Sequence, residues 1–194
     1  MIYTRLMLLL GSSFENMPVL SLRVGNTVGR VIGHLINPHK LTIDALWCKM
    51  SNSREPQLIL VQDIREVSIK GIIVNDHEVA VEPGEVIRLK PIIELAYELL
   101  GKKVISGKLS IGRVNDYAIE VEKYSIQKLY ANPSALARLK TTRLTIDRSQ
   151  IIEVSQNYVK VKDSRISEGV KKVMSRPTQA GLSSSVASAS TTNE

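Results

Sequence analysis

The amino-acid sequence predicts a mainly β protein built from two tandem copies of one small unit, joined by a short helix. Three observations lead to this prediction. Blocks of similar sequence recur in the same order in the two halves of the chain. These blocks are rich in Val, Ile, Thr and Tyr, which favour strands. Turn-forming pairs of residues interrupt them every 8–12 residues, a spacing typical of small barrels and sandwiches.

The internal repeat is clearest in four pairs of blocks. Residues 28–31 (VGRV) match residues 111–114 (IGRV), which lie 83 positions later. Three further pairs have offsets of 83, 85 and 87 residues: 43–47 with 126–130, 19–21 with 104–106, and 63–67 with 150–154. A small drift in offset is expected when loops differ in length, because the entropy cost of a longer loop grows slowly. Four pairs in one order indicate a duplicated unit.

Each copy contains a glycine inside a strand-like run, Gly29 in the first and Gly112 in the second. Such a glycine often marks a bulge or a bend where a small sheet curls over itself. Within a unit, no apolar pattern of helical period separates the strands. The unit therefore reads as a small barrel or a compact sandwich, and a crossover α/β fold is not expected.

Helices are predicted only at the edges of the units. Pro91 opens a helix over residues 91–101 that links the units, and Gly101 ends it. A second helix is predicted over residues 164–176, and the Ser-, Ala- and Thr-rich residues 177–194 are predicted to be a disordered tail. The predicted organisation is therefore a first unit over 1–90, the linker helix, a second unit over 102–163, the C-terminal helix and the tail.

Composition is that of a soluble globular protein. The chain has 194 residues, with 43% hydrophobic and 23% charged residues and a net charge of +7. The charge is uneven, because residues 1–100 carry a net −1 and residues 101–194 a net +8. The longest apolar run covers only residues 6–10, and Cys48 is the single cysteine. We therefore expect a cytoplasmic protein without a membrane span or a disulfide.

The two copies resemble PRC-barrel domains. The shared pattern is a short V-x-S strand (19–21 and 104–106), a hydrophobic-Gly-x-Val segment (28–31 and 111–114), an I-x-x-L strand (43–46 and 126–129) and a late I-x-x-V strand (64–67 and 151–154). The resemblance covers about 160 residues of the chain. It implies two six-stranded β-barrels. It also implies a docking role, since such barrels occur in the H subunit of the photosynthetic reaction centre and in a ribosome-maturation factor that binds a ribosomal protein.

The sequence contains no arrangement typical of an active site. The three histidines, His34, His39 and His77, have no second His or Cys at metal-ligand spacing. Cys48 lies in a strand with no neighbouring base and is expected to be a half-buried core residue. Glycines 25, 29 and 33 do not form a nucleotide-binding pattern, and no helix is predicted after them. We expect no enzymatic activity, no cofactor and no metal.

Two features remain as candidate partner-binding surfaces. The first is the pair Trp47 and Tyr130, which occupy equivalent positions in the copies and could instead be core or junction residues. The second is the basic set of the second half: Arg138, Lys140, Arg143, Arg148, Lys160 and Lys162.

These surfaces support two classes of function. The first is a non-enzymatic adaptor that docks onto another protein or protein complex. The alternative is a ribosome- or RNA-associated factor that uses the basic second half. An anionic membrane surface ranks behind both, and a small-molecule substrate is not expected.

Overall fold

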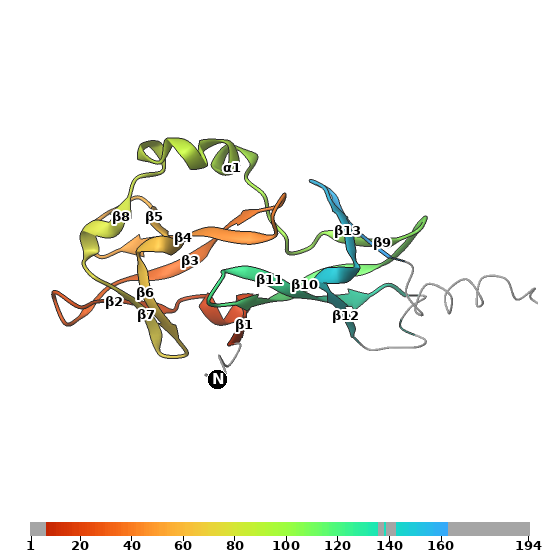
Figure 1. The fold of residues 1–194 in the computed structure, drawn as a ribbon, viewed down its shortest axis with the longest axis horizontal. Coiled ribbons are helices and arrows are strands. Elements are labelled where there is room, and N and C mark those ends of the chain that lie inside the picture. The colour runs from red at the N-terminus through yellow and green to blue at the C-terminus, as the bar shows by residue number, and fades with distance from the viewer. Residues whose placement is uncertain (1–6, 136–137, 139–142, 163–194) are drawn as a thin grey trace, which may run out of the picture.

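The structure is a computed structural model that describes residues 7–135, 138 and 143–162. Within these ranges the protein is mainly β, with fourteen strands and a single α-helix of six residues (Figure 1). The mainly β class predicted from the sequence is confirmed. In the same ranges no helix has the length and apolar character needed to cross a membrane. The predicted helix over 164–176 and the predicted tail over 177–194 lie outside the described residues.

The first unit contains six strands that hydrogen-bond in the order β6–β7–β2–β3–β4–β5. Their bounds are β2 Pro18–Ser21, β3 Thr27–Asn37, β4 Thr42–Met50, β5 Gln57–Leu60, β6 Ile64–Ser68 and β7 Gly71–Val74. The pair β2–β7 is parallel, and the other neighbours in this unit are antiparallel. A strand of two residues, β8 Ala80–Val81, pairs with the outer edge of β5.

The second unit repeats this order as β13–β14–β9–β10–β11–β12. Its strands are β9 Lys103–Ser106, β10 Leu109–Glu120, β11 Ser125–Pro133, β12 Leu144–Asp147, β13 Ile151–Val154 and β14 Tyr158–Val161. Again only the pair of first and last strands, β9–β14, is parallel. Six strands in one order, with the parallel pair in the same place, show that the repeat in sequence is a repeat in structure.

Short 3-10 helices connect several strands. They cover Gly11–Phe14, Val61–Asp63, His77–Val79, Pro83–Glu85, Ile87–Leu89 and Arg148–Gln150. The ladder of strand pairs runs as an open path from β13 to β6. The closure of each unit into a barrel therefore stays a prediction.

The two repeat glycines lie next to bulges, as the sequence predicts, but the tighter constraint is close packing. In the β2–β3 pair the bulged residue is Val28, beside Gly29, and in the β9–β10 pair it is Ile111, beside Gly112. A Cβ atom on Gly112 would lie 2.4 Å from the carbonyl oxygen of Asn132, and one on Gly29 would lie 2.9 Å from that of Lys49. At both positions the neighbouring strand leaves no room for a side chain.

The two units meet through equivalent residues of equivalent turns. Ile43 N donates a hydrogen bond to Tyr124 O at 2.7 Å, and Ile126 N donates to Leu41 O at 2.9 Å. Leu41 and Tyr124 are themselves equivalent, and both have a left-handed backbone, with φ of 50° and 49°. Reciprocal contacts of this kind are those of an approximate two-fold axis. The axis passes between Thr42 and Ser125, the residues that pair β4 with β11.

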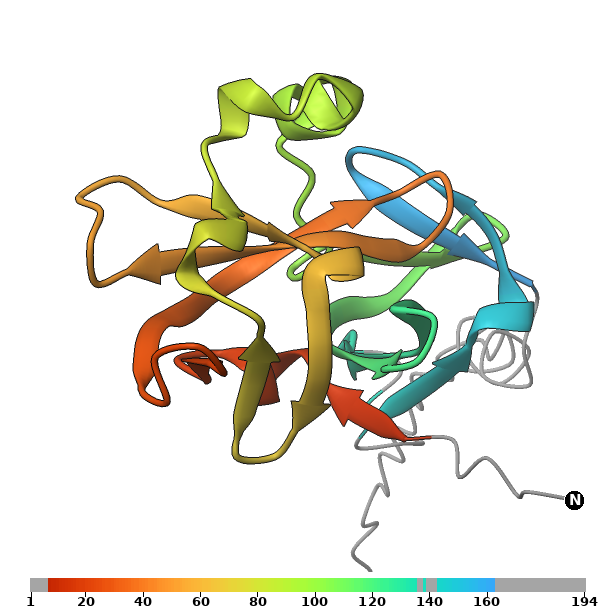
Figure 2. The ribbon, with the colours of Figure 1, turned by 60° about the vertical axis from the view of Figure 1, so that its left-hand side comes forward.

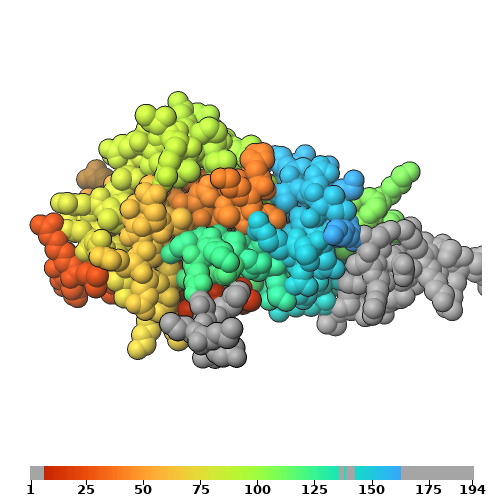
Figure 3. Space-filling model, in the orientation of Figure 1, coloured from red at the N-terminus to blue at the C-terminus, as the bar shows by residue number. Residues whose placement is uncertain are grey.

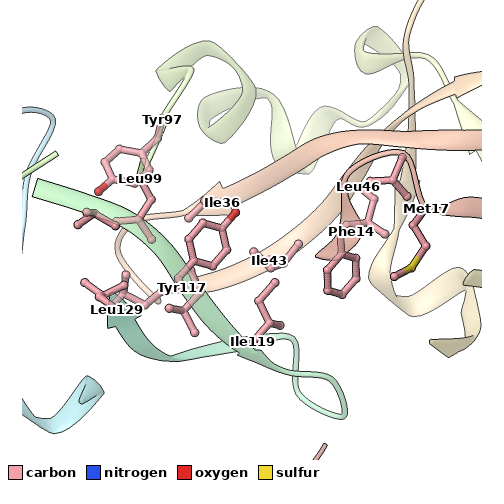
Figure 4. Packing of buried hydrophobic residues seen from close by; sticks show 14 of the residues in the cluster. Phe14, Met17, Ile36, Ile43, Leu46, Tyr97, Leu99, Tyr117, Ile119 and Leu129 are labelled. Carbon is pink, nitrogen blue, oxygen red and sulfur yellow. The ribbon is translucent and has the colours of Figure 1, made fainter. Parts of the chain in front are cut away.

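A single hydrophobic core extends across this junction. Buried residues from both units form one contact cluster, and Figure 4 shows Ile43 of β4 beside Ile119 of β10, with Leu46 of β4 beside Phe14 and Met17. Phe14 and Leu99, which precede the first strand of each unit, are both almost fully buried in it. The core therefore joins the units instead of filling each one separately.

The segment that precedes each unit packs on the other unit. Strand β1, Leu8–Leu10, pairs with Ala118–Glu120 of β10 in the second unit. Helix α1, Lys90–Leu95, precedes the second unit and packs against β3 of the first. Figures 1 and 2 show β1 and α1 on opposite sides of the molecule.

The linker helix is shorter than the predicted 91–101. It ends at Leu95 because Ala96 adopts a left-handed conformation with φ of 44°, which directs the chain into the second unit. Tyr97 and Leu99 are then buried beyond the helix. Tyr97 and Leu99, which resemble the end of a helical stripe, therefore serve as core residues of an extended segment.

Candidate functional site

The outer face of the first unit is covered by its own chain. On β4 and β5, Ala45 pairs with Leu60 and Trp47 with Leu58, and these residues belong to a second apolar cluster. The segment from β8 to α1 packs on them through residues that include Val81, Val86, Leu89, Ile92 and Ile93. Figure 3 shows this yellow-green segment lying over the first unit. The face is thus an internal packing surface.

The equivalent face of the second unit is polar and exposed. Lys128 pairs in register with Asp147, where the first unit has Ala45 and Leu60, and their side chains form an ion pair of 3.0 Å. The hydrogen bond that Lys128 donates to Asp147 raises the pKa of Lys128. Beside them Tyr130 pairs with Thr145, and the Arg143 guanidinium lies over the Tyr130 ring at 4.2 Å. We call these five residues the second-unit outer face: Lys128, Tyr130, Arg143, Thr145 and Asp147.

The two residues of the predicted aromatic pair lie in different environments, one beside the covered face of the first unit and one on the second-unit outer face. Trp47 and Tyr130 do occupy equivalent positions on β4 and β11, as the repeat predicts. Trp47 is half-buried against the second apolar cluster, which agrees with the alternative of a packing role. Tyr130 is half-buried and carries the Arg143 guanidinium on its ring.

The other predicted basic residues lie at separate places in the second unit. Lys160 projects from β14 on the side opposite the buried Val159 and Val161, and Lys162 follows the strand and is exposed. Arg138 is exposed near the end of β11. Lys140 lies outside the described residues.

Arg148 is engaged in the junction between the units. Its guanidinium donates to the carbonyl oxygens of Leu41 and Ile126 at 2.9 and 3.0 Å, and to that of Lys40. These carbonyls belong to the turns that meet at the approximate two-fold axis. Arg148 therefore stabilises the association of the units, a role that its position in a basic stretch does not reveal.

The histidines and the cysteine do not assemble into a catalytic group. Cys48 is fully buried, more deeply than predicted, and burial raises the pKa of its thiol to about 12, so a thiolate does not form near neutral pH. Asp76 accepts hydrogen bonds from Arg23 and from the backbone and ring of His77. The bond from Arg23 is the main cause that lowers the pKa of Asp76. Within the described ranges no three His, Cys, Asp or Glu residues are grouped for a metal ion.

His34 occupies a site that sequence reasoning missed. Its Nδ1 lies 2.8 Å from the hydroxyl of Tyr117, 83 residues later and the equivalent position of the second unit. The ring also packs edge-on against Phe14, at 5.0 Å between centroids. Burial lowers the pKa of His34 to about 4, so the imidazole is neutral. The contact could have been predicted from the equivalence of positions 34 and 117, because equivalent residues of a duplicated unit can meet at its two-fold axis.

A scan of protein-family models finds no match to this chain, and a search of curated proteins finds none with significant similarity.

Proposed function

We propose that this protein is a cytoplasmic, non-enzymatic docking adaptor built from two PRC-type barrels, and that the second-unit outer face binds the partner. Two sets of six strands in the same order are compatible with the pair of six-stranded barrels that the family resemblance implies. The repeat motifs of the resemblance fall on β2, β3, β4 and β6 and on their equivalents. The proposal therefore rests first on the duplicated architecture.

One observation carries the proposal: the outer faces of the two equivalent units have different side chains. In the first unit this face is apolar and binds a segment of the same chain through a strand and a helix. In the second unit the strands keep the register, but charged and aromatic side chains replace the apolar ones, and Thr145 and Asp147 are exposed. A face that binds a protein segment in one copy is a natural place to bind another protein in the other copy.

The side chains of this face suit a protein partner. Tyr and Arg are enriched among residues that contribute most to protein–protein affinity. The Arg143 guanidinium lies over the Tyr130 ring, so this face combines a cation and an aromatic ring, a combination common in protein interfaces. The net +8 of the second half favours an acidic partner surface and steers its approach. We therefore propose an acidic protein surface as the partner.

The experiment compares two double variants in quantitative co-precipitation from the native lysate. Tyr130→Ala with Arg143→Glu removes the ring and reverses the charge on the second-unit outer face, and should lower partner recovery at least tenfold. Arg30→Glu with Lys40→Glu places the same kind of charge reversal on exposed residues of the first unit and should leave recovery unchanged. Circular dichroism checks that both variants fold. Loss of the partner in the first-unit variant alone would contradict the proposal.

The alternative, a ribosome- or RNA-associated factor, is favoured by the charge of the second half and by the stacked Arg143 and Tyr130 pair, which could also meet phosphates and bases. The same co-precipitation distinguishes it when repeated with nuclease and at two salt concentrations. Binding through phosphates releases counterions and weakens steeply with salt. Recovery that survives nuclease treatment supports the protein partner, and recovery that nuclease abolishes supports the RNA-associated factor.

A further inference from the structure

A surface hollow of about 470 Å³ lies in the first unit, at the start of β3 and the end of β4. These strand ends lie away from the turn that meets the second unit (Figure 1). Two residues that line the hollow are basic, Arg30 of β3 and Lys49 of β4, and none of its described lining residues is acidic. The hollow therefore concentrates positive charge in a half of the chain that is otherwise nearly neutral.

The strand register places the two cations directly opposite each other. Arg30 pairs with Lys49, and both side chains are exposed, because their strand neighbours Val31 and Cys48 are the ones that point into the core. Side chains at such positions have Cβ atoms about 5 Å apart, and like charges there destabilise a sheet. Among the described residues no carboxylate pairs with either cation, and no atom accepts a hydrogen bond from its side chain. The chain itself leaves this repulsion uncompensated.

The equivalent place in the second unit lacks this excess of charge. There Arg113, the counterpart of Arg30, pairs with Asn132 instead of a lysine. The Arg113 guanidinium also donates to the carbonyl oxygen of Gly101 at 3.0 Å. The counterpart of Gly101 is Asn16, which has a similar left-handed backbone and lines the hollow. The second unit thus has one cation that its own chain binds, whereas the first unit has two that are left without a partner.

Other residues of the hollow add hydrogen-bond donors. Thr27 and Ser51 each have a hydroxyl and Asn16 an amide, and among the described residues none of these three side chains has a hydrogen-bond partner. Ser53 also lines the hollow, but its hydroxyl donates to the carbonyl oxygen of Glu55. Two cations and three such donors exceed what a carboxylate, with one charge, can satisfy. They match a phosphate monoester, which carries about two negative charges and three strong acceptor oxygens.

We propose that this hollow binds a doubly charged phosphate group, carried by a small phosphate monoester or free in solution. Arg30 offers parallel N–H donors that fit two phosphate oxygens, and Lys49 adds a second positive charge beside them. The hydroxyls of Thr27 and Ser51 donate to the phosphate oxygens as well. The half-exposed Ile32 borders the hollow, where the organic part of a monoester lies. The site belongs to the first unit and is independent of the proposed docking function.

The test is an NMR titration of the full chain that follows the backbone amide signals. It is run at about pH 7.5, where a phosphate monoester is mostly a dianion, and at constant ionic strength, so that screening does not change. Phenyl phosphate and inorganic phosphate are the probes, and we expect saturable shifts of the Thr27 and Ser51 amides. Tighter binding of phenyl phosphate supports a monoester ligand, and equal or tighter binding of inorganic phosphate supports free phosphate. Dimethyl phosphate, a diester with one charge, should bind about tenfold more weakly than phenyl phosphate.

Four variants locate the site, and the amide spectrum of each shows whether it folds. Arg30→Gln should weaken binding of phenyl phosphate about tenfold or more. Lys49→Asn, which gives the first unit the asparagine of the second, should weaken it about fivefold. Arg113→Gln makes the equivalent change in the second unit, and Lys40→Asn removes an exposed lysine at the other end of the strands, so both should bind like the unaltered protein.

Three results would overturn the proposal. The first is a set of shifts that do not saturate, and the second is equal binding of dimethyl phosphate and phenyl phosphate. The third is an equal loss of binding in Arg113→Gln and Arg30→Gln. Any of them would mean that the hollow attracts anions only through general surface charge.

Discussion

The two units of this protein share a strand order, a register and a pair of bulged strands, yet they use one face in opposite ways. On the first unit Ala45 and Leu60 are buried under the segment from β8 to α1. On the second unit Lys128 and Asp147 form an exposed ion pair at the same positions. The inner faces build one common core, so they are constrained together. The outer faces do not share a core and can differ. A duplicated unit can therefore acquire a binding surface without changing its fold.

The largest effect is expected when the second unit's ion pair is moved into the first unit. Ala45→Lys with Leu60→Asp places two charges on a face that is now sealed by the linker segment. Because desolvation of buried charges is costly, the variant should lose about 4 kcal/mol of unfolding free energy or more. Urea denaturation measures this loss. A variant as stable as the parent would show that the covering segment is only loosely attached.

The equivalent glycines Gly29 and Gly112 allow a second comparison. Replacing either by valine should lower the free energy of unfolding by about 2–3 kcal/mol. Gly112→Val should cost about 3 kcal/mol, because its nearest neighbour is the rigid backbone carbonyl of Asn132. Gly29→Val should cost about 2 kcal/mol, because its nearest atom is the Sδ of the flexible Met50. Gly33→Ala, whose Cβ would be 3.8 Å from Trp47, is the control and should change stability little. The reverse order of the two Val variants would contradict this account of the close approach.

At the axis, His34 and Tyr117 differ in that only the histidine has an ordinary pKa near neutral pH. Since the folded-state pKa of His34 is about 4, below the ordinary 6.5, the unfolded chain binds its proton more readily. This contribution to stability is full above about pH 6.5 and is lost as the pH falls towards 4. The loss of unfolding free energy is about 3 kcal/mol, because each unit by which the folded and unfolded pKa values differ corresponds to about 1.36 kcal/mol.

His34→Asn keeps an acceptor near the position of Nδ1 but does not titrate. The fall in unfolding free energy between pH 7 and pH 4.5 should therefore be smaller in this variant, by about 2 kcal/mol. Denaturant titrations at the two pH values give the comparison. Asp116, whose charge acts on His34, is present in both proteins. An equal loss of stability in the two proteins would place the titration elsewhere.

The smallest effect is expected from the opposite exchange, Lys128→Ala with Asp147→Leu. Both side chains are substantially exposed, and exposed ion pairs contribute little to folding. The midpoint of thermal unfolding should stay within about 2 °C of the parent. Partner recovery in the co-precipitation experiment should nevertheless fall, because the variant replaces charges of the second-unit outer face. A large loss of stability would mean that this ion pair belongs to the structural framework of the second unit.

Much of the fold could be predicted because the duplication repeats the same sequence pattern in both halves of the chain. The paired motifs located the equivalent strands, and Gly29 and Gly112 marked the bulged strands correctly. The length of the linker helix could not be predicted, because the left-handed turn at Ala96 accompanies the burial of Tyr97 and Leu99 in the core that both units share. The pairing of β1 with β10 of the second unit is likewise a long-range contact that no local sequence pattern indicates.

The candidate sites were predicted less completely. The equivalence of Trp47 and Tyr130 was correct, but sequence alone did not show that one lies beside a covered face and the other on an exposed face. Arg148 stood among basic residues, although three backbone carbonyls at the junction engage it. At another equivalent pair of positions the first unit has Gly33 and the second has Asp116, whose carboxylate accepts hydrogen bonds from Ser12. Such a difference becomes visible only when the two units are superposed as strands.

The pairing of β1 with β10 also sets an order of events during synthesis of the chain. Leu8–Leu10 leave the ribosome early, but their partners Ala118–Glu120 follow about 110 residues later. At bacterial or eukaryotic elongation rates this interval is roughly 5–20 s. During that time the first unit has an apolar strand without its partner, and the site of Ser12 without Asp116. The nascent first half therefore waits, incomplete, for the second half to be translated.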